Sequence, residues 1–422
     1  MVYSIKYGSG TVDVPLEGAR VLGELHGRKT PPVADIASAL RRAVDSPIES
    51  PPLRQFARPG DRVALVVSDM SRFWMRQDCV IPHLVEQLTR ECGVSPEAVD
   101  IVVANGTHMG GSEAELRTLV TDGVYNSVRV TNHDCLAPGL VELGTTSYGT
   151  PVRINPIVAN ADKVVCLGAC AHHVMAGFGG GRKSILPGVS GMETIKRNHA
   201  LALDPVAPRS NPRIGNGVLA GNPLHADMCE AAVMVKSLFM VNLVMNAEME
   251  LAYITAGHWL HSWERACEAA NAIYQTPIEE KADAIIAGCG GYPKDMSLYQ
   301  GTKTIDNVET GLKENGTLIV LMECREGGEP REYFDWLSPL AQGRLAEKLR
   351  ESFTIPGYIF FLNCEQARRY RVMLLTSLPA ETLAPMGIEA YSDIHALLAA
   401  ANLAGKSVYV IPNGSTVIPQ CE

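Results

Sequence analysis

Short apolar runs alternate with polar loops and helix-like stretches along the first half of the chain. Residues 62–68 and 99–104 are apolar runs of the length of buried strands, and residues 163–168 form a third. Between them, residues 80–92 carry apolar side chains at helical spacing, and Ser112-x-x-Glu115 has the sequence of a capping box at the start of a helix. This alternation predicts a parallel sheet with helices on its faces.

The second half repeats the alternation. Its pattern predicts paired strands at 235–245 and 251–255, a long helix at 257–275, a strand at 282–287, a helix through 312, a strand at 317–322 and a strand at 408–411. We therefore expect an α/β protein with two α/β domains, mostly parallel sheets and an active site in the cleft between them. The expected boundaries are residues 1–262, a linking helix at 263–280 and a Rossmann-like domain at 281–422.

Length and composition agree with a two-domain enzyme. The 422 residues exceed what one hydrophobic core usually supports, and 46% hydrophobic residues suffice to fill two. A net charge of −9 repels nucleic acid, and no apolar run is long enough to span a membrane. The first eight residues alternate like a strand and lack a signal-peptide pattern, and the eleven scattered cysteines are typical of a reducing cytoplasm.

The most unusual segment is a glycine loop that ends in Lys183. A phosphate-binding P-loop needs glycine directly before its lysine, where this chain has Arg182, and a continuing helix, where Pro187-Gly188 intervenes. The arginine also breaks the dinucleotide-binding pattern. A phosphotransferase thus remains an alternative that the loop fits poorly. The glycines at 179, 180 and 181 would still let backbone approach an anion beside the Lys183 amine.

Histidines surround this loop, and a further one follows an earlier strand. His172, His173 and His199 flank the loop, whereas His108 lies beyond the carboxyl end of the strand at 99–104, on the edge where α/β sheets bind ligands. A single histidine is more often a polar core residue, and a single lysine is usually solvated. Their combination around one loop favours a functional site.

The chain resembles the nickel-pincer-nucleotide lactate racemase family in this segment. The signature is histidine, two residues, Ala-Gly-Phe, a glycine pair and a basic residue before lysine, then Pro-Gly and a later histidine. Here it reads His173-Val-Met-Ala-Gly-Phe-Gly-Gly-Gly-Arg-Lys183, Pro187-Gly188 and Asn198-His199. Supporting segments spread along nearly the whole chain: Ser68-Asp69-x-x-Arg72, Asn105-Gly-Thr-His108, Gly221-Asn-Pro-Leu and Gly291-Tyr-Pro-Lys-Asp-x-x-Leu-Tyr-Gln300-x-x-Lys303.

The resemblance implies a covalent cofactor. Lys183 would carry a pyridinium-3-thioamide-5-thiocarboxylic acid mononucleotide, installed by cofactor biosynthesis enzymes, in which two sulfurs and a ring carbon bind nickel. His199 would be the protein's nickel ligand, completing a planar site that suits a d⁸ ion. The glycines at 179, 180 and 181 would form the loop around the cofactor, although the family often has serine at the first of these positions.

The resemblance also implies the reaction. A 2-hydroxy acid would lose its C2 hydrogen as hydride and its hydroxyl proton to a base, and return of hydride to the other face of the 2-keto acid would invert the centre. His108 and His173 match the family's acid/base pair, while His172 has the same chemistry in a poorer register. A non-enzymatic carrier of the cofactor, the other alternative, would not need His108 or the substrate residues.

The substrate residues implied by the resemblance come from both halves of the chain. Arg72 and Lys303 would hold the carboxylate, with Gln300 and Tyr299 lining the pocket, although Gln300-x-x-Lys303 is also ordinary helical spacing. Asp69 would either orient a histidine or bind the cofactor ribose. Because residues 357–363 differ from those of lactate enzymes, the substrate is left open between lactate and a larger, more polar 2-hydroxy acid, and the oligomeric state is not predicted.

Overall fold

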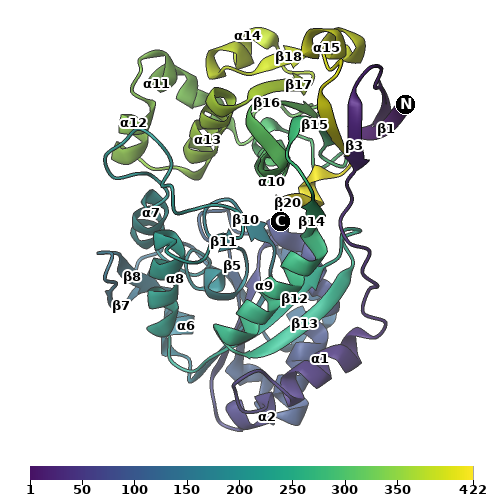
Figure 1. Ribbon diagram of the computed structural model, residues 1–422. Coiled ribbons are helices and arrows are strands. Elements are labelled where there is room, and N and C mark those ends of the chain that lie inside the picture. Colours follow the sequence, from purple (N-terminus) through teal and green to yellow (C-terminus); the bar gives the residue numbers. More distant parts are fainter. Residues whose placement is uncertain (422) are drawn as a thin grey trace. The chain divides into compact units, whose positions relative to one another are not determined.

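The computed structural model describes residues 1–421, which group by contacts into two compact units (Figure 1). The larger unit holds Lys29–Ala202 and Asn211–Ala272. The smaller unit holds Met1–Arg28, Leu203–Ser210 and the chain from Ile273 onward. Each unit is built on its own six-stranded sheet and is described by itself.

The sheet of the larger unit contains the strands predicted for the first half of the chain. Its order is β13 (Leu251–His258), β12 (Leu238–Met245), β9 (Lys163–Ala169), β4 (Val63–Ser68), β5 (Val99–Ala104) and β6 (Arg129–Asn132). All neighbours are parallel except β12 and β13. The chain builds outward from β4 through β5 and β6 and then returns to β9 on the other side. The switch in direction therefore lies between β4 and β9, where open α/β sheets bind ligands.

Helices cover both faces of this sheet. Their apolar residues recur at helical spacing, so each helix has an apolar side that packs against the strands. The capping box at Ser112 is present, with its hydroxyl accepting from the Glu115 N–H, and it starts α4 (Glu113–Val120). The helix predicted at 80–92 is α3 (Ile81–Glu86), continued by a π-helical turn. The remaining elements are α1 (Ile36–Asp45), α2 (Leu53–Phe56), α5 (Asp122–Ser127), α6 (Pro156–Asn160), α7 (Met192–Ala200), α8 (Pro223–Val233), α9 (His261–Tyr274), β7 (Val141–Thr145), β8 (Pro151–Ile154), β10 (His172–His173) and β11 (Gly177–Phe178).

The smaller unit has an entirely parallel sheet. Its order is β18 (Glu389–Tyr391), β17 (Arg371–Leu375), β16 (Leu312–Leu321), β15 (Ala282–Gly288), β19 (Ser407–Ile411) and β3 (Arg20–Glu24). The other elements are α10 (Leu298–Val308), α11 (Leu337–Ala341), α12 (Leu345–Glu351), α13 (Ile355–Arg369), α14 (Ala380–Leu383), α15 (Ile394–Ala401) and the pair β14 (Gln275–Ile278) and β20 (Ile418–Cys421).

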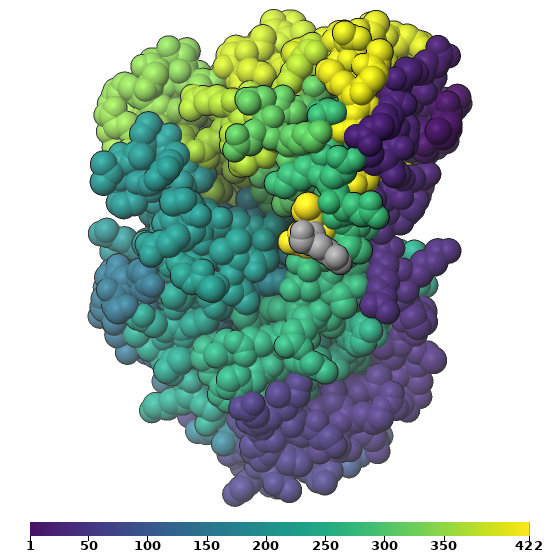
Figure 2. Space-filling model, in the orientation of Figure 1, coloured from purple at the N-terminus to yellow at the C-terminus, as the bar shows by residue number. Residues whose placement is uncertain are grey.

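The amino terminus belongs to the smaller unit. The hairpin of β1 (Val2–Tyr7) and β2 (Gly10–Pro15) places Ile5 and Val14 in the core of that unit, and the Gly8 N–H donates to buried Asp295 at 2.6 Å. Figure 2 shows these purple residues against yellow residues near the carboxyl end. The domain boundary predicted from the sequence placed residues 1–28 in the amino-terminal domain, whereas the structure groups them with the smaller unit. They join that unit because β3 pairs with β19, and such a long-range pairing leaves no local signal in the sequence.

The α/β class with mostly parallel sheets is confirmed, with two local corrections. The helix predicted from 257 begins at His261, because β13 continues through His258. The helix predicted through 312 ends at Val308, and after one 3₁₀ turn β16 begins at Leu312. Within residues 1–421 no helix has the length and hydrophobicity needed to cross a membrane.

Candidate functional site

Three loops at the switch point of the larger unit carry most of the predicted site residues. Asp69 follows β4, the segment from Asn105 to His108 follows β5, and the loop that leads to Lys183 follows β9. The strands are adjacent and parallel, so their carboxyl ends lie at one edge of the sheet. The second and third loops also touch, because the Gly106 N–H donates to the Gly188 carbonyl at 2.9 Å.

Asp69 and His108 form a close pair at this edge. The His108 Nδ1 lies 2.5 Å from the Asp69 Oδ2, and Asp69 is 7% exposed. Burial alone would raise the pKa of Asp69, but the hydrogen bond and charge of His108, the Ser71 hydroxyl and the charge of Arg72 together lower it below its usual value. Asp69 is thus a carboxylate that fixes the proton on His108 Nδ1 and leaves Nε2 with the lone pair.

Arg72 lies in the 3₁₀ turn that follows Asp69. Its Nη1 donates to the Ser71 hydroxyl at 3.1 Å, and that hydroxyl donates to the Asp69 Oδ1 at 2.6 Å. The side chain of Arg72 is half-buried, so its guanidinium is held near the Asp69–His108 pair and still has donors for an anion. Ser71 was not predicted as a site residue from the sequence. A serine two residues after an aspartate is too common in loops to indicate this role.

The glycine loop is packed against protein. Gly180 and Gly181 have φ angles of +66° and +54°. A Cβ at Gly180 would lie 2.7 Å from the Ala169 carbonyl oxygen, and one at Gly181 would lie 2.5 Å from the Trp263 ring. The sequence suggested that these glycines let backbone approach an anion, whereas their first requirement is the close packing of the loop on β9 and on Trp263.

Arg182, which in the sequence is a mismatch to the P-loop and the basic residue of the family signature, holds the loop together from inside. It is 0% exposed, and its guanidinium lies 3.9 Å from the centre of the Trp263 ring. Its Nη1 and Nη2 donate to the carbonyls of Phe178 and Ala176 at 2.9 and 2.6 Å. The buried arginine therefore closes the turn immediately before Lys183, which is half-buried.

Lys183 lies close enough to His199 for its charge to oppose protonation of the imidazole. His199 is in the last turn of α7, 2% exposed, and its Nδ1 donates to the Ile195 carbonyl at 3.0 Å. Burial and the charge of Lys183 lower the pKa of His199 to about 3, against the effect of the Ile195 hydrogen bond. His199 is therefore neutral at physiological pH with its lone pair on Nε2, the form of histidine that binds metals.

The adjacent residues His172 and His173 have different environments because successive side chains of a strand face opposite ways. The His172 ring packs against Phe178 at a tilt of 42° with a centroid distance of 4.7 Å, and its Nε2 lies 2.8 Å from the Asn271 Oδ1. Burial lowers the pKa of His172 to about 4. His173 accepts the N–H groups of Met175 and Ala176 on Nδ1, at 3.2 and 3.3 Å, which leaves the proton of the neutral ring on Nε2.

The remaining predicted residues lie on α10 of the smaller unit. Lys303 is exposed on that helix. The backbone N–H of Gln300 donates to the hydroxyl of Ser297, the residue that caps the helix, at 3.3 Å. The ring of Tyr299 meets that of Tyr333 edge-on, with 6.4 Å between the ring centroids. The helical spacing noted in the sequence is thus real, and Gln300 and Lys303 share one side of α10.

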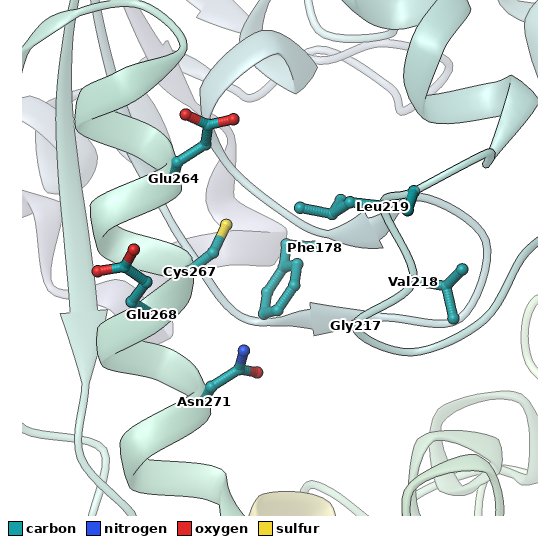
Figure 3. Close-up of a pocket in the computed structure, with 9 residues that line it drawn as sticks. Phe178, Gly217, Val218, Leu219, Glu264, Cys267, Glu268 and Asn271 are labelled. Carbon is teal, nitrogen blue, oxygen red and sulfur yellow. The ribbon is translucent and has the colours of Figure 1, made fainter.

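A surface pocket of about 510 Å³ lies in the larger unit beside the glycine loop (Figure 3). Residues of α9 form one wall and the segment Gly217–Ala220 with Phe178 forms the other. None of the predicted site residues lines it. Nowhere in residues 1–421 do three or more histidine, cysteine or acidic side chains come together as a metal site.

The chain matches two family models, one for each part of the lactate racemase architecture. The model of the lactate racemase N-terminal domain matches residues 7–210, and that of the C-terminal domain matches residues 278–419. The chain belongs to the lactate racemase family. It is accordingly an isomerase of the racemase class.

Named members of this family are similar over most of the chain. A lactate racemase of Thermoanaerobacterium thermosaccharolyticum is 28% identical over 79% of this chain and 76% of its own length. A lactate racemase of Lactiplantibacillus plantarum is 29% identical over 68% of this chain and 66% of its own length.

Solved structures extend the likeness to the whole fold. The lactate racemase apoprotein from Thermoanaerobacterium thermosaccharolyticum superposes with a TM-score of 0.88 at 25% identity, covering 100% of both chains. A protein from Thermotoga maritima, with a TM-score of 0.64 at 18% identity over 92% of this chain and 97% of that one, shares the fold.

Proposed function

We propose that the protein inverts the C2 centre of a 2-hydroxy acid, lactate or a larger and more polar relative, with a nickel-pincer nucleotide joined to Lys183. One observation carries this proposal: a neutral, buried His199 lies within the electrostatic reach of Lys183. The two residues are the cofactor's covalent anchor and its metal ligand in the resemblance read from the sequence. The names of the relatives give lactate as the first substrate to test.

The donor set fits such a group. His199 supplies one imidazole nitrogen, and its other nitrogen is fixed by the Ile195 carbonyl, an arrangement that orients metal-bound histidines. In the part of the chain that the structure describes, no group of three or more histidine, cysteine or acidic side chains could hold a metal ion. A group that brings sulfur and carbon donors of its own would complete a planar nickel site with one histidine. When bound, the nucleotide supplies the acceptor for the C2 hydride.

His108 is proposed as the base that takes the hydroxyl proton. Its Nδ1–H donates to Asp69, so Nε2 has the lone pair that a base needs. The negative charge of Asp69 then stabilises the imidazolium that forms when the proton arrives. Of the two roles left open for Asp69 by the sequence, this geometry supports the orientation of a histidine.

His173 is proposed as the second proton-transfer residue, and the two rings are not equivalent. Two backbone N–H groups point at His173 Nδ1, so its neutral ring presents Nε2–H as a donor. We infer that His173 first holds the substrate oxygen and that His108 carries out the more demanding proton removal. Because His172 is bound to Asn271 and Phe178, we propose a packing role for it.

The substrate carboxylate is proposed to bind Arg72 and Lys303. Arg72 offers a planar fork of donors beside the Asp69–His108 pair, and Lys303 is an exposed ammonium on α10 with Tyr299 and Gln300 next to it. In a chain of net charge −9, each of these cations gives its own unit a positive group that can attract a carboxylate. A simple cofactor carrier would have no use for the oriented His108.

A labelled-substrate screen tests the proposal. Protein produced together with the cofactor biosynthesis enzymes is incubated with single-enantiomer 2-hydroxy acids that carry deuterium at C2. We expect the opposite enantiomer to form with deuterium retained in ordinary water, because a C2 hydrogen removed as hydride would not exchange with solvent. Complete loss of deuterium would show removal of a proton instead, and racemisation by Lys183→Ala would show that the cofactor anchor is dispensable.

A further inference from the structure

Two cysteines of the larger unit lie side by side behind the glycine loop. The Sγ atoms of Cys170 and Cys267 are 3.4 Å apart, although the residues are 97 positions apart in the chain. Cys170 directly follows β9 and begins the segment that leads to Lys183, while Cys267 lies on α9. Both are almost completely buried, with exposures of 1% and 4%.

A fully buried cation lies beside this pair. The Nε of Arg182 has no hydrogen-bond partner among the described residues, and the arginine has no carboxylate among its hydrogen-bond acceptors there. Burial lowers the pKa of Arg182 to about 10, and electrostatic interaction with Cys229, Cys267 and Cys170 opposes this shift. A guanidinium so placed favours the thiolate, the form in which cysteine reacts with oxidants, but it does not offset the burial that raises the pKa of Cys267.

Only one of the two sulfurs can be reached from solvent through the pocket. Cys267 is among the residues that line it, and Cys170 is not. Figure 3 shows the Cys267 sulfur directed into the pocket, with Glu264 and Glu268 on the same face of α9. Glu264 lies 3.0 Å from His261 and Glu268 pairs with Arg265 at 2.6 Å, so they disfavour an anionic reagent such as glutathione disulfide only weakly, and a small neutral peroxide can enter.

We propose that Cys170 and Cys267 form a reversible disulfide when the protein meets hydrogen peroxide. The Cys267 thiol gives up its proton as its sulfur attacks one peroxide oxygen. The O–O bond breaks and the proton passes to the departing hydroxide, so that the products are Cys267 sulfenic acid and water. The Cys170 sulfur then attacks the Cys267 sulfur, the S–O bond breaks, and a second water leaves. Two electrons pass from the two thiols to one peroxide, which is reduced to two waters in all.

The bond would tie α9 to the start of the loop that carries Lys183. Burial raises the pKa of Cys267 despite the charge of Arg182, so Cys267 rests as a protonated thiol. In the structure both cysteines are free, and the cross-link forms only with an oxidant. The disulfide is thus a response to oxidant and not part of the resting structure. The inference holds whether or not Lys183 carries a nucleotide, because it depends only on the cysteines, Arg182 and the pocket.

Peptide mapping of the full-length protein tests the proposal. Reduced protein is treated with hydrogen peroxide, denatured, alkylated with N-ethylmaleimide and digested without reductant. We expect a peptide pair joined through Cys170 and Cys267, an intact mass lower by about 2 Da before alkylation, and a loss of two alkylatable thiols out of 11, all reversed by dithiothreitol. No joined pair at a peroxide dose that oxidises the more exposed Cys79 would overturn the proposal.

Variants separate the two steps. In Cys170→Ala, and in Cys170→Ser should the first variant fold poorly, Cys267 should stop at sulfenic acid and react with dimedone. The matched control Cys166→Ala removes another fully buried thiol of β9 and should leave the cross-link unchanged. A bond from Cys267 to Cys229, or faster reaction with glutathione disulfide than with peroxide, would contradict the pairing or the route through the pocket.

Discussion

Replacement of Asp69 by asparagine tests the proton-transfer role of His108. The substitution Asp69→Asn keeps the size of the side chain but removes the charge that faces His108 Nδ1 at 2.5 Å. The new amide can also present its NH₂ group to that nitrogen, which would favour the tautomer with the proton on Nε2. His108 would then lack a lone pair on the nitrogen that is proposed to meet the substrate hydroxyl.

The size of the effect follows from the hydrogen bond that is lost. A hydrogen bond to a charged group contributes about 1.5–3 kcal/mol, and each 1.4 kcal/mol changes a rate about tenfold, so kcat should fall about 10- to 100-fold. KM should change little, because the carboxylate of the substrate is proposed to bind elsewhere. Ser71→Ala is the matched control, since it removes a hydrogen bond to Asp69 but leaves the contact between Asp69 and His108 in place, and we expect a smaller loss in kcat, about threefold.

The assay is the initial rate of loss of optical purity, measured with holoenzyme whose cofactor content is determined by intact mass. Equal kcat in wild type and Asp69→Asn would refute the orienting role. A variant that instead lost its cofactor would assign Asp69 to the ribose, the alternative that the sequence left open. A collapse of the fold is excluded by an unchanged melting temperature.

Three further predictions concern the loop, acid stability and the substrate. Gly181→Ala should lower the free energy of unfolding by about 2–4 kcal/mol, because its φ is +54° and its Cβ would meet Trp263, whereas Gly179→Ala should be tolerated in chemical denaturation. His172 has a pKa of about 4 in the folded protein, whereas in the unfolded chain its pKa is about 6.5. Its neutral form therefore stabilises the folded state fully above pH 6.5. This contribution, about 3 kcal/mol, is lost as the pH falls to 4. His172→Gln should show a shallower loss in urea titrations over this range, and an unchanged slope would contradict the assignment. Arg72→Lys should raise KM about tenfold, and an unchanged KM would remove Arg72 from carboxylate binding.

The sequence predicts those strands and helices whose signal lies within a few neighbouring residues. The buried runs that became β4, β5 and β9 and the capping box before α4 carry their signal within a few residues. The assignment of β1 to β3 to the smaller unit depends on pairing between β3 and β19, which lie near opposite ends of the chain. No local pattern contains that information.

The candidate site likewise has features that local sequence patterns predict and features that depend on long-range contacts. The order of strands and loops places Asp69, His108 and Lys183 at one edge of a sheet, as a sequence pattern can indicate. The packing of Arg182 on Trp263 and the contact between Cys170 and Cys267 join α9 to the loop after β9, and only the folded chain brings them together. The difference between His172 and His173 likewise arises from their partners, since their residue type is the same.

The most direct test of the central claim is the intact mass of the active protein. In protein matured with the cofactor biosynthesis enzymes, we expect a covalent adduct with the mass of the sulfur-bearing pyridinium mononucleotide, localised to Lys183 and absent from Lys183→Ala. His199→Ala should keep the adduct and lose bound nickel. An unmodified chain that racemises its substrate at the full rate would contradict the account.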